Sequence, residues 1–200
     1  MQNKNLAWLD LETTGFTELD KKSVYKHKIL EIGLIVTDSN FRPIATLNQV
    51  IHHDLEEIVP ICDDVVKQMH TKNGLFDEVV RSAITLEMAE KAVIDFLIQH
   101  GVDRKASPMC GSGIQFDRMF TEAQMPALND HLHYRNLDVS AVKEFIKTIV
   151  PGLEPKKRLA HRAIDDIQET LAEARHYRGI MKPALEAARK AFLEESGPSL

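Results

Sequence analysis

The spacing of apolar residues changes near residue 51, and this change restricts the fold more than any other feature of the sequence. Before it, three segments have the alternating or continuously apolar pattern of β-strands: residues 5–12, 29–37 and 44–51. After it, two segments have the spacing of amphipathic helices: residues 62–69 and 85–99. The chain is therefore predicted to open with an antiparallel meander of three strands and to continue with helices.

Strands and helices alternate in the rest of the sequence. Two further short strands are predicted, at residues 108–111 and 136–139. Helices are predicted at residues 114–123, at 141–149 with Ser140 as N-cap, and from about 159 to 192. A meander followed by alternating helices and strands is typical of an α/β fold, here with a mixed five-stranded sheet flanked by helices. Residues 16–28 are predicted to form a long polar loop.

Composition limits the class of protein. The 200 residues, 44% of them hydrophobic, suit one compact domain, which we assign to residues 1–180 with a helical extension and tail at 181–200. The net charge of −5 argues against a protein that coats long nucleic acid. The sequence has no apolar stretch of the roughly 18 residues that a membrane span needs, so we expect no membrane partner and a cytoplasmic location.

Two acids share one face of the first predicted strand. Alternation places Trp8, Asp10 and Glu12 on one side and Leu9 and Leu11 on the other. The apolar neighbours indicate a central strand, where paired acids require cations or hydrogen bonds. Two carboxylates beside a turn can bind one divalent cation, and hard oxygen ligands favour Mg²⁺ or Mn²⁺. The alternative is a solvated edge strand, on which two acids need no metal.

Two further acids stand on predicted helices. Asp117 follows a glycine-containing turn and falls near the first turn of its helix, where a favourable interaction with the helix dipole is the alternative explanation. In the last helix, about 100° per residue places Asp166 on the flank of the apolar stripe and Asp165 nearly opposite it. We therefore expect Asp166 to face the sheet and Asp165 to be solvated.

His161 precedes Asp166 by five residues, a spacing that does not align the two side chains on one helical face. We place it just before the helix, on a loop that begins near Pro151. A histidine there could act as general base and accept a proton from water. The alternative is an ordinary surface histidine beside the basic segment at 156–158.

Together, these segments resemble the DEDD-type 3′→5′ exonucleases of the RNase H-like fold. The first motif of that family reads Asp10-Leu-Glu12 here, the second supplies Asp117, and the last, H-x-A-x-x-D, runs from His161 to Asp166. Within this branch, residues 6–180 are most similar to members that degrade very short RNA. The stretches that carry this similarity are WLDLETTG at 8–15, MHTKNGL at 69–75, CGSGIQFDRMF at 110–120, HYRNLDVS at 133–140 and HRAIDDI at 161–167.

The resemblance implies hydrolysis of RNA of about two to five nucleotides, dinucleotides included, to nucleoside 5′-monophosphates by a homodimer. Four carboxylates around a phosphodiester suit two divalent ions, Mg²⁺ or Mn²⁺, one activating water and the other stabilising the leaving 3′-oxygen. The metal ligands would be Asp10, Glu12, Asp117 and Asp166, with His161 as general base. The residues implied to bind substrate are Phe16 and His70 at the bases, and Tyr134, Arg135 and Ser140 of a second subunit at the 5′-phosphate.

Several alternatives stay open on the sequence alone. Tyr134 could belong to the core, Arg135 to a surface ion pair, and Ser140 could serve only as a helix cap. The chain departs from the resembled pattern in its long loop 16–28, in Ser112-Gly113 where the family usually has Asn-Ser, and in the residues after 180. Another exonuclease of the same branch, acting on longer DNA or RNA strands, and a non-catalytic module that binds nucleotide ends are the two alternative functions.

Overall fold

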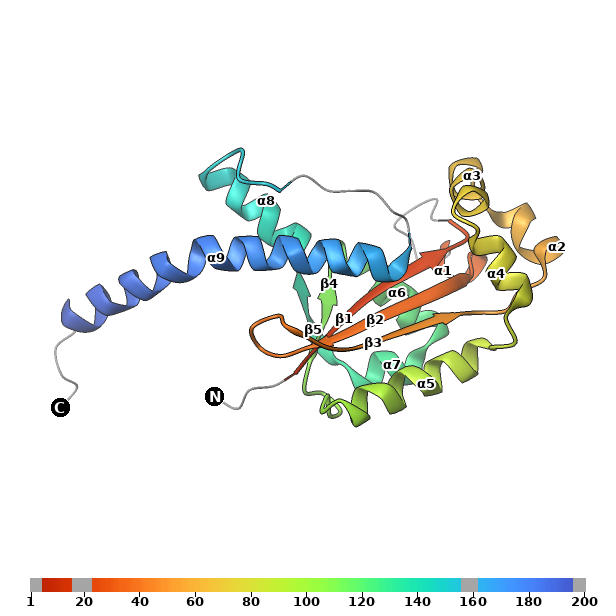
Figure 1. Ribbon diagram of the computed structural model, residues 1–200, viewed down its shortest axis with the longest axis horizontal. Helices are drawn as coiled ribbons and strands as arrows, with labels where there is room; N and C mark the ends of the chain where they lie inside the picture. Colours follow the sequence, from red (N-terminus) through yellow and green to blue (C-terminus); the bar gives the residue numbers. More distant parts are fainter. Residues whose placement is uncertain (1–4, 16–22, 156–161, 196–200) are drawn as a thin grey trace.

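The computed structural model describes residues 5–15, 23–155 and 162–195, and a single five-stranded sheet forms the centre of the described part (Figure 1). The strand order is β3-β2-β1-β4-β5. The strands are β1 Leu6–Thr13, β2 Ile29–Thr37, β3 Pro43–Val50, β4 Pro108–Gly111 and β5 His133–Asp138. β1 pairs antiparallel with β2, and β2 with β3, whereas β1–β4 and β4–β5 are parallel. The predicted fold class, a mixed sheet that opens with a meander, is confirmed.

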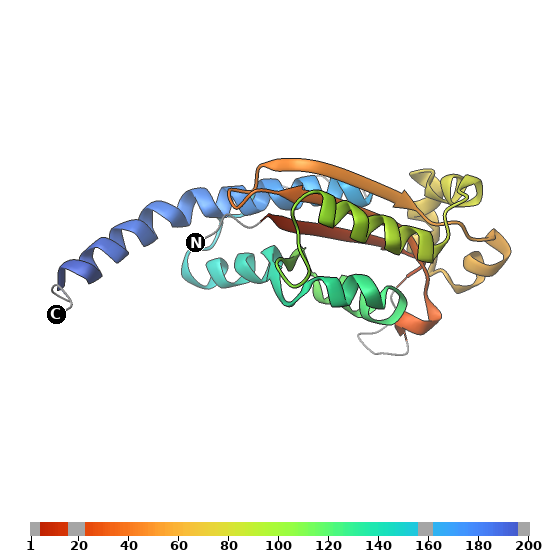
Figure 2. The ribbon, with the colours of Figure 1, turned by 90° about the horizontal axis from the view of Figure 1, so that it is seen from below.

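Helices cover both faces of this sheet (Figures 1 and 2). The short helical segments are α1 Ser23–Lys26, α2 Leu55–Ile58, the 3-10 turn η1 Val59–Ile61, α4 Leu75–Arg81 and α7 Pro126–His131. The longer helices are α3 Asp64–Lys72, α5 Leu86–Gln99, α6 Gln115–Gln124, α8 Val139–Ile149 and α9 Ala163–Glu195. Helices α5, α6 and α7 pack on one face of the sheet, and α9 with α8 packs on the other.

The alternation predicted for β1 separates two cores. Ala7, Leu9 and Leu11 are buried against α5, α6 and α7. Trp8 is buried on the opposite face against α9, and its indole N–H donates to Thr37 Oγ1 at 3.0 Å. A third apolar cluster joins β2 to α2 and α4 through Leu30. β1 is thus a central strand that is buried on both faces, as the sequence predicted.

Most predicted elements are present, and the differences have local causes. Helices α2, α4 and α7 were not predicted, because four to seven residues are too few to show a helical period. α1 occupies part of the predicted loop 16–28. The prediction that Ser140 caps α8 is wrong. Asp138 is the N-cap, and its carboxylate accepts the N–H of Ser140 at 2.9 Å.

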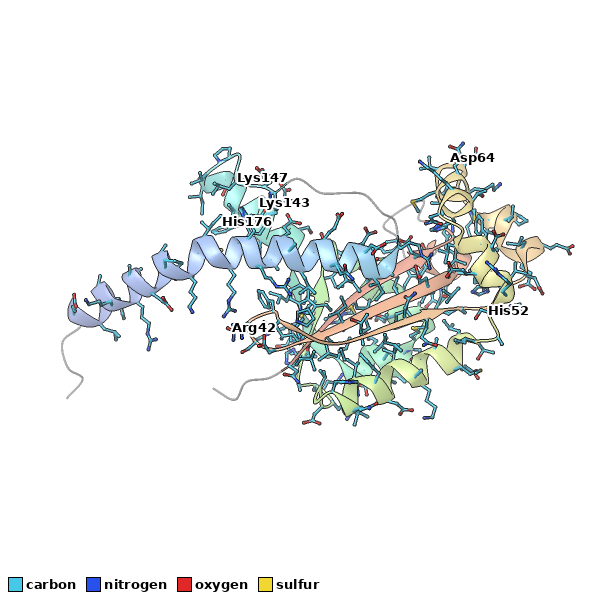
Figure 3. The ribbon with its side chains drawn as sticks, viewed as in Figure 1. Arg42, His52, Asp64, Lys143, Lys147 and His176 are labelled. Atoms are coloured by element: carbon cyan, nitrogen blue, oxygen red, sulfur yellow. The ribbon has the colours of Figure 1, made fainter. Side chains whose placement is uncertain are left out.

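Helix α9 packs on the sheet at its N-terminal end and projects beyond the sheet at its C-terminal end. Its 33 residues begin over β1 and β2, and its C-terminal part extends beyond the sheet (Figures 1 and 2). Figure 3 labels Lys143 and Lys147 of α8 and His176 of α9 toward the end from which α9 projects, and His52 and Asp64 at the opposite end of the molecule, near α2 to α4. In the described residues, no helix combines the length and apolar character that crossing a membrane requires.

Candidate metal centre

Three carboxylates from two distant segments meet beside the sheet. Asp10 and Glu12 point from β1 toward α9, and Asp166 extends toward them from the first turn of α9. One oxygen from each of these side chains lies within 4.8 Å of the others. Asp165, the adjacent acid, is exposed. The choice of Asp166 over Asp165 made from helical spacing agrees with this geometry.

Asp117 is the fourth predicted acid, and it is held differently. It is buried in the first turn of α6, and its Oδ1 accepts the backbone N–H of Leu11 at 3.0 Å. The Leu11 N–H is available for this bond because β4 is short: it pairs with β1 only at Ala7 and Trp8 and leaves the later part of β1 unpaired on that edge. The Asp117 carboxylate therefore accepts an N–H that β4 leaves unpaired, next to Asp10. Asp117 lies outside the group of three acids, but its charge acts on Asp10.

The acids raise one another's pKa values. Burial raises the pKa of Asp10 well above its usual range, and the charges of Asp117, Glu12 and Asp166 add to the effect. Burial and the charge of Asp166 raise the pKa of Glu12 to about 8. Burial raises the pKa of Asp117 to about 7, against the hydrogen bond from Leu11. Such a group of carboxylates becomes favourable in its ionised form when divalent cations compensate its charge.

The first turn of α9 approaches the sheet very closely. Gly33 pairs with Asp10 in the β1–β2 register, and a Cβ atom built on Gly33 would lie 2.8 Å from the Ala163 Cβ. Beside this contact, Glu31 accepts the N–H of Ala163 at 3.2 Å and pairs with Arg162 at 2.7 Å. Sequence reasoning missed Glu31, although a single acid inside the apolar strand ILEIG carried the same signal as Asp10 and Glu12.

The predicted substrate-binding residues have varied environments. His70 is fully buried in α3, with its Nε2 3.0 Å from the Thr13 carbonyl oxygen and 3.8 Å from Glu12 Oε2. The Ser140 hydroxyl donates to Asp138 at 2.7 Å and accepts the Gly113 N–H at 3.1 Å. Both side chains therefore have structural partners within the chain, and their roles toward substrate stay predictions.

Tyr134 and Arg135 lie on the outer strand β5, remote from the acids of their own chain. Tyr134 is 74% exposed and stacks on His133, and the Arg135 guanidinium lies 5.5 Å from the Tyr134 ring centre. The parallel register aligns the later residue Asn136 with Met109, and Met109 with Ala7. Tyr134 and Arg135 are therefore more than about 10 Å from Asp10 along and across the strands. Phe16 and His161 lie outside the described residues.

Comparisons with known proteins identify the family. The exonuclease family model RNase_T matches residues 7–174. The oligoribonuclease of Corynebacterium glutamicum is 37% identical over 201 residues, covering 99% of this chain and 84% of that protein. That of Corynebacterium diphtheriae is 38% identical over 196 residues, covering 95% and 90%.

Solved structures show the same fold at low identity. The zinc-bound complex of Escherichia coli exonuclease I with single-stranded DNA has a TM-score of 0.67 at 15% identity, covering 93% of this chain and 43% of that one. The Mg²⁺- and Mn²⁺-bound form of Schizosaccharomyces pombe Pop2p has a TM-score of 0.60 at 16% identity, covering 86% and 82%. These likenesses establish the RNase H-like fold alone. The family assignment comes from sequence: the chain belongs to the oligoribonuclease family, within the DEDD-type 3′→5′ exonucleases.

Proposed function

We propose that this protein is a metal-dependent 3′→5′ exoribonuclease that hydrolyses RNA of about two to five nucleotides, dinucleotides included, to nucleoside 5′-monophosphates. One observation carries the proposal. In a chain of an exonuclease family, Asp10, Glu12 and Asp166 come together within 4.8 Å from a strand and a helix that are far apart in sequence. The similarity to the oligoribonucleases of the two Corynebacterium species supports the choice of RNA as substrate.

The donor set fits hard divalent cations, because the converging ligand atoms are all carboxylate oxygens whose mutual repulsion a cation would relieve. We propose Asp10, Glu12, Asp166 and the adjacent Asp117 as the residues that hold two ions, Mg²⁺ or Mn²⁺. When bound, such ions supply an activated water and stabilise the leaving 3′-oxygen. His161 would accept the proton of that water.

Preference for short RNA would come from groups that recognise both ends of the substrate. Phe16 and His70 are proposed to contact the bases. Tyr134 and Arg135 are proposed to bind the 5′-phosphate, together with Ser140, from a second subunit, since a guanidinium and hydroxyl groups are suitable phosphate donors. The exposure of Tyr134 and the distance of β5 from the acids of the same chain support a contribution from another copy.

A digestion series tests the function directly. RNA and DNA single strands from dinucleotide to twenty-mer are incubated with Mg²⁺ or Mn²⁺, and products are separated by chromatography. We expect nucleoside 5′-monophosphates, with the highest kcat/KM on the shortest RNA. Faster cleavage of long strands or of DNA would favour another exonuclease of the branch. Absence of metal-dependent hydrolysis on every substrate would favour a non-catalytic module.

Asp166 and its neighbour Asp165 on α9 provide a test variant and a matched control for the proposed metal site. Asp166→Asn removes a proposed ligand and is expected to lower kcat/KM for a dinucleotide by at least about a thousandfold. Asp165→Asn changes an exposed acid one residue earlier and is expected to keep kcat/KM within about twofold. Equal losses in both variants would contradict the proposed metal centre.

The proposed dimer has its own test. Light scattering measures the mass of the native protein, and Arg135→Ala is assayed on dinucleotides with and without a 5′-phosphate. We expect a dimer and a KM that rises about tenfold or more for the phosphorylated dinucleotide only. A monomer with full activity would remove the proposed role of Tyr134 and Arg135.

A further inference from the structure

A fifth acid, Glu31, lies next to the candidate metal centre and accepts hydrogen bonds from residues at the start of α9. Glu31 of β2 lies opposite Glu12 in the antiparallel register and is 1% exposed. Its Oε1 accepts hydrogen bonds from Asn48 Nδ2 at 2.8 Å and from Arg162 Nη2 at 2.7 Å. Its Oε2 accepts the N–H of Ala163 at 3.2 Å. Glu31 therefore connects β2 to the start of α9, and it lies outside the group formed by Asp10, Glu12 and Asp166.

Arg162 connects this buried acid to a second one. Its Nη1 and Nη2 donate to the two carboxylate oxygens of Glu78 on α4, at 2.8 and 2.9 Å. The Arg162 side chain is 23% exposed and lies between Glu31 on β2 and Glu78 on α4. A planar guanidinium can bridge two carboxylates with fixed geometry, whereas a lysine ammonium cannot reproduce this fork.

The backbone of Arg162 connects the bridge to the metal centre. Its carbonyl oxygen accepts the N–H of Asp166 at 3.0 Å, so the two residues belong to the same helical turn. Ala163, the next residue in this turn, packs against Gly33 so closely that it has no space to move nearer to β2. A displacement of the Arg162 backbone would therefore be transmitted to Asp166 through this turn.

We propose that Arg162, held between Glu31 and Glu78, is a positioning residue that orients the first turn of α9 so that Asp166 meets Asp10 and Glu12. It thereby sets the affinity of the site for divalent cations. This inference rests on the metal-dependent function proposed above. A competing role for Arg162 is charge balance alone, since its positive charge opposes the burial and the acidic neighbours that raise the pKa of Glu12.

Two substitutions separate positioning from charge balance. Arg162→Lys keeps the charge and loses the fork, and Arg162→Met loses both. Calorimetric titration with Mn²⁺ measures the affinity in the absence of any substrate. Positioning predicts that both variants bind Mn²⁺ about tenfold or more weakly. Charge balance alone predicts unchanged affinity in Arg162→Lys and tighter binding in Arg162→Met, because a nearby positive charge repels the cation, and either result would overturn the proposal.

Controls exclude a general loss of stability. Arg175→Lys alters an arginine within α9, which donates to the Phe41 carbonyl oxygen at 2.9 Å, and this variant is expected to leave Mn²⁺ affinity unchanged. Glu78→Gln changes the more exposed partner, so it is expected to fold normally and to weaken Mn²⁺ binding less than Arg162→Lys. Wild-type Mn²⁺ affinity in Glu78→Gln and Arg162→Lys, with folding verified by circular dichroism, would contradict positioning even if Arg162→Met does not fold.

Hydrolysis of a dinucleotide at saturating Mn²⁺ distinguishes this inference from the proposed function. Positioning predicts that Arg162→Lys lowers kcat and keeps KM within about twofold, because the proposal gives Arg162 contacts to Glu31 and Glu78 and no role in binding substrate. If the wild-type protein binds Mn²⁺ but cleaves nothing, the proposed function fails while the affinity comparison still supports positioning. If the wild-type protein cleaves dinucleotides and Arg162→Lys equals it in kcat and Mn²⁺ affinity, the function stands and positioning fails.

Discussion

The two faces of β1 differ in what stabilises them. On one face, the side chains of Ala7, Leu9 and Leu11 are buried against the helices α5, α6 and α7 and are stabilised by apolar packing. On the other face, Trp8 belongs to an apolar cluster, but Asp10 and Glu12 follow it and meet Asp166. One strand therefore carries a packed face and an acidic face at alternating positions.

The two faces of β1 therefore contribute to the free energy of folding with opposite sign: the packed face stabilises the fold, and the acidic face destabilises it. Apolar burial contributes free energy at any pH and in any buffer, whereas closely placed carboxylates oppose folding until protons or cations compensate them. The packed face, together with the bridge through Arg162, must hold the acids at short distances. Variants on the two faces should consequently respond in opposite ways to metal and pH.

Neighbouring positions of β1 provide the largest contrast. Leu9→Ala leaves a cavity in the packed face and is expected to lower the free energy of unfolding by about 2–5 kcal/mol. Asp10→Asn removes a repelled, desolvated carboxylate and is expected to raise the stability of the metal-free protein by on the order of 1 kcal/mol. Urea denaturation in EDTA measures both values. Destabilisation by Asp10→Asn would show that the acidic face is already compensated without cations.

The acidic face should also make the metal-free protein less stable as pH rises. Burial raises the pKa of Glu12 from 4.5 to about 8 and that of Asp117 from 3.8 to about 7. Between these ordinary and raised values, the unfolded chain has released protons that the folded chain retains, so folding becomes less favourable with increasing pH. We expect a fall on the order of a few kcal/mol between about pH 5 and pH 8 in EDTA.

Cations should reverse this trend, because they favour the ionised carboxylates. The increase in melting temperature on adding Mn²⁺ is therefore expected to be larger at pH 8 than at pH 6, as measured by thermal denaturation at fixed ionic strength. A metal-free stability that increases between these pH values would contradict the raised pKa values of Glu12 and Asp117.

Gly33 tests how closely the two elements of the acidic face must approach. In Gly33→Ala, the new methyl group would lie 2.8 Å from the Ala163 Cβ and 2.9 Å from its backbone carbon, so α9 must shift. We expect a loss of about 1–3 kcal/mol in stability, measured by urea denaturation, and weaker Mn²⁺ binding. Gly179→Ala, in α9 itself, is the control. A Cβ atom at that position has nothing within 4 Å, so this variant should stabilise the helix slightly.

Ser140 carries the smallest expected effect. Ser140→Ala removes the hydrogen bonds to Asp138 and from Gly113, and is expected to lower stability by about 1 kcal/mol. An assay on dinucleotides with and without a 5′-phosphate shows whether Ser140 also binds substrate. An equal KM for wild type and variant on both substrates would restrict Ser140 to its structural role.

Periodicity was sufficient to predict the elements that are long or strongly patterned. Alternation in β1 placed Asp10 and Glu12 on one face, and helical spacing selected Asp166, because both patterns depend only on local backbone geometry. The proximity of Asp117 depends instead on the short strand β4, which leaves the Leu11 N–H open. No local pattern encodes that relation between segments, so its place was expected only through the family resemblance.

Other features were missed for related reasons. Helices α2 and α4 are too short for a clear period, so the position of Glu78 and its pairing with Arg162 could not be predicted. The cap of α8 was assigned to Ser140 because serine is a common N-cap. Asp138 replaced it because strand β5 continues directly into the helix without a loop.

The contact between Gly33 and Ala163 has a consequence for how such sequences diverge. Neither residue has a polar side chain, but the space between them limits how closely α9 can approach the strand beside Asp10, Glu12 and Asp166. If the proposed metal site is correct, the two positions should change together during evolution, and a larger side chain at either one should be accepted only after the proposed metal-binding acids have been lost. A survey of homologues can therefore use this pair as a steric marker that separates active enzymes from inactive descendants.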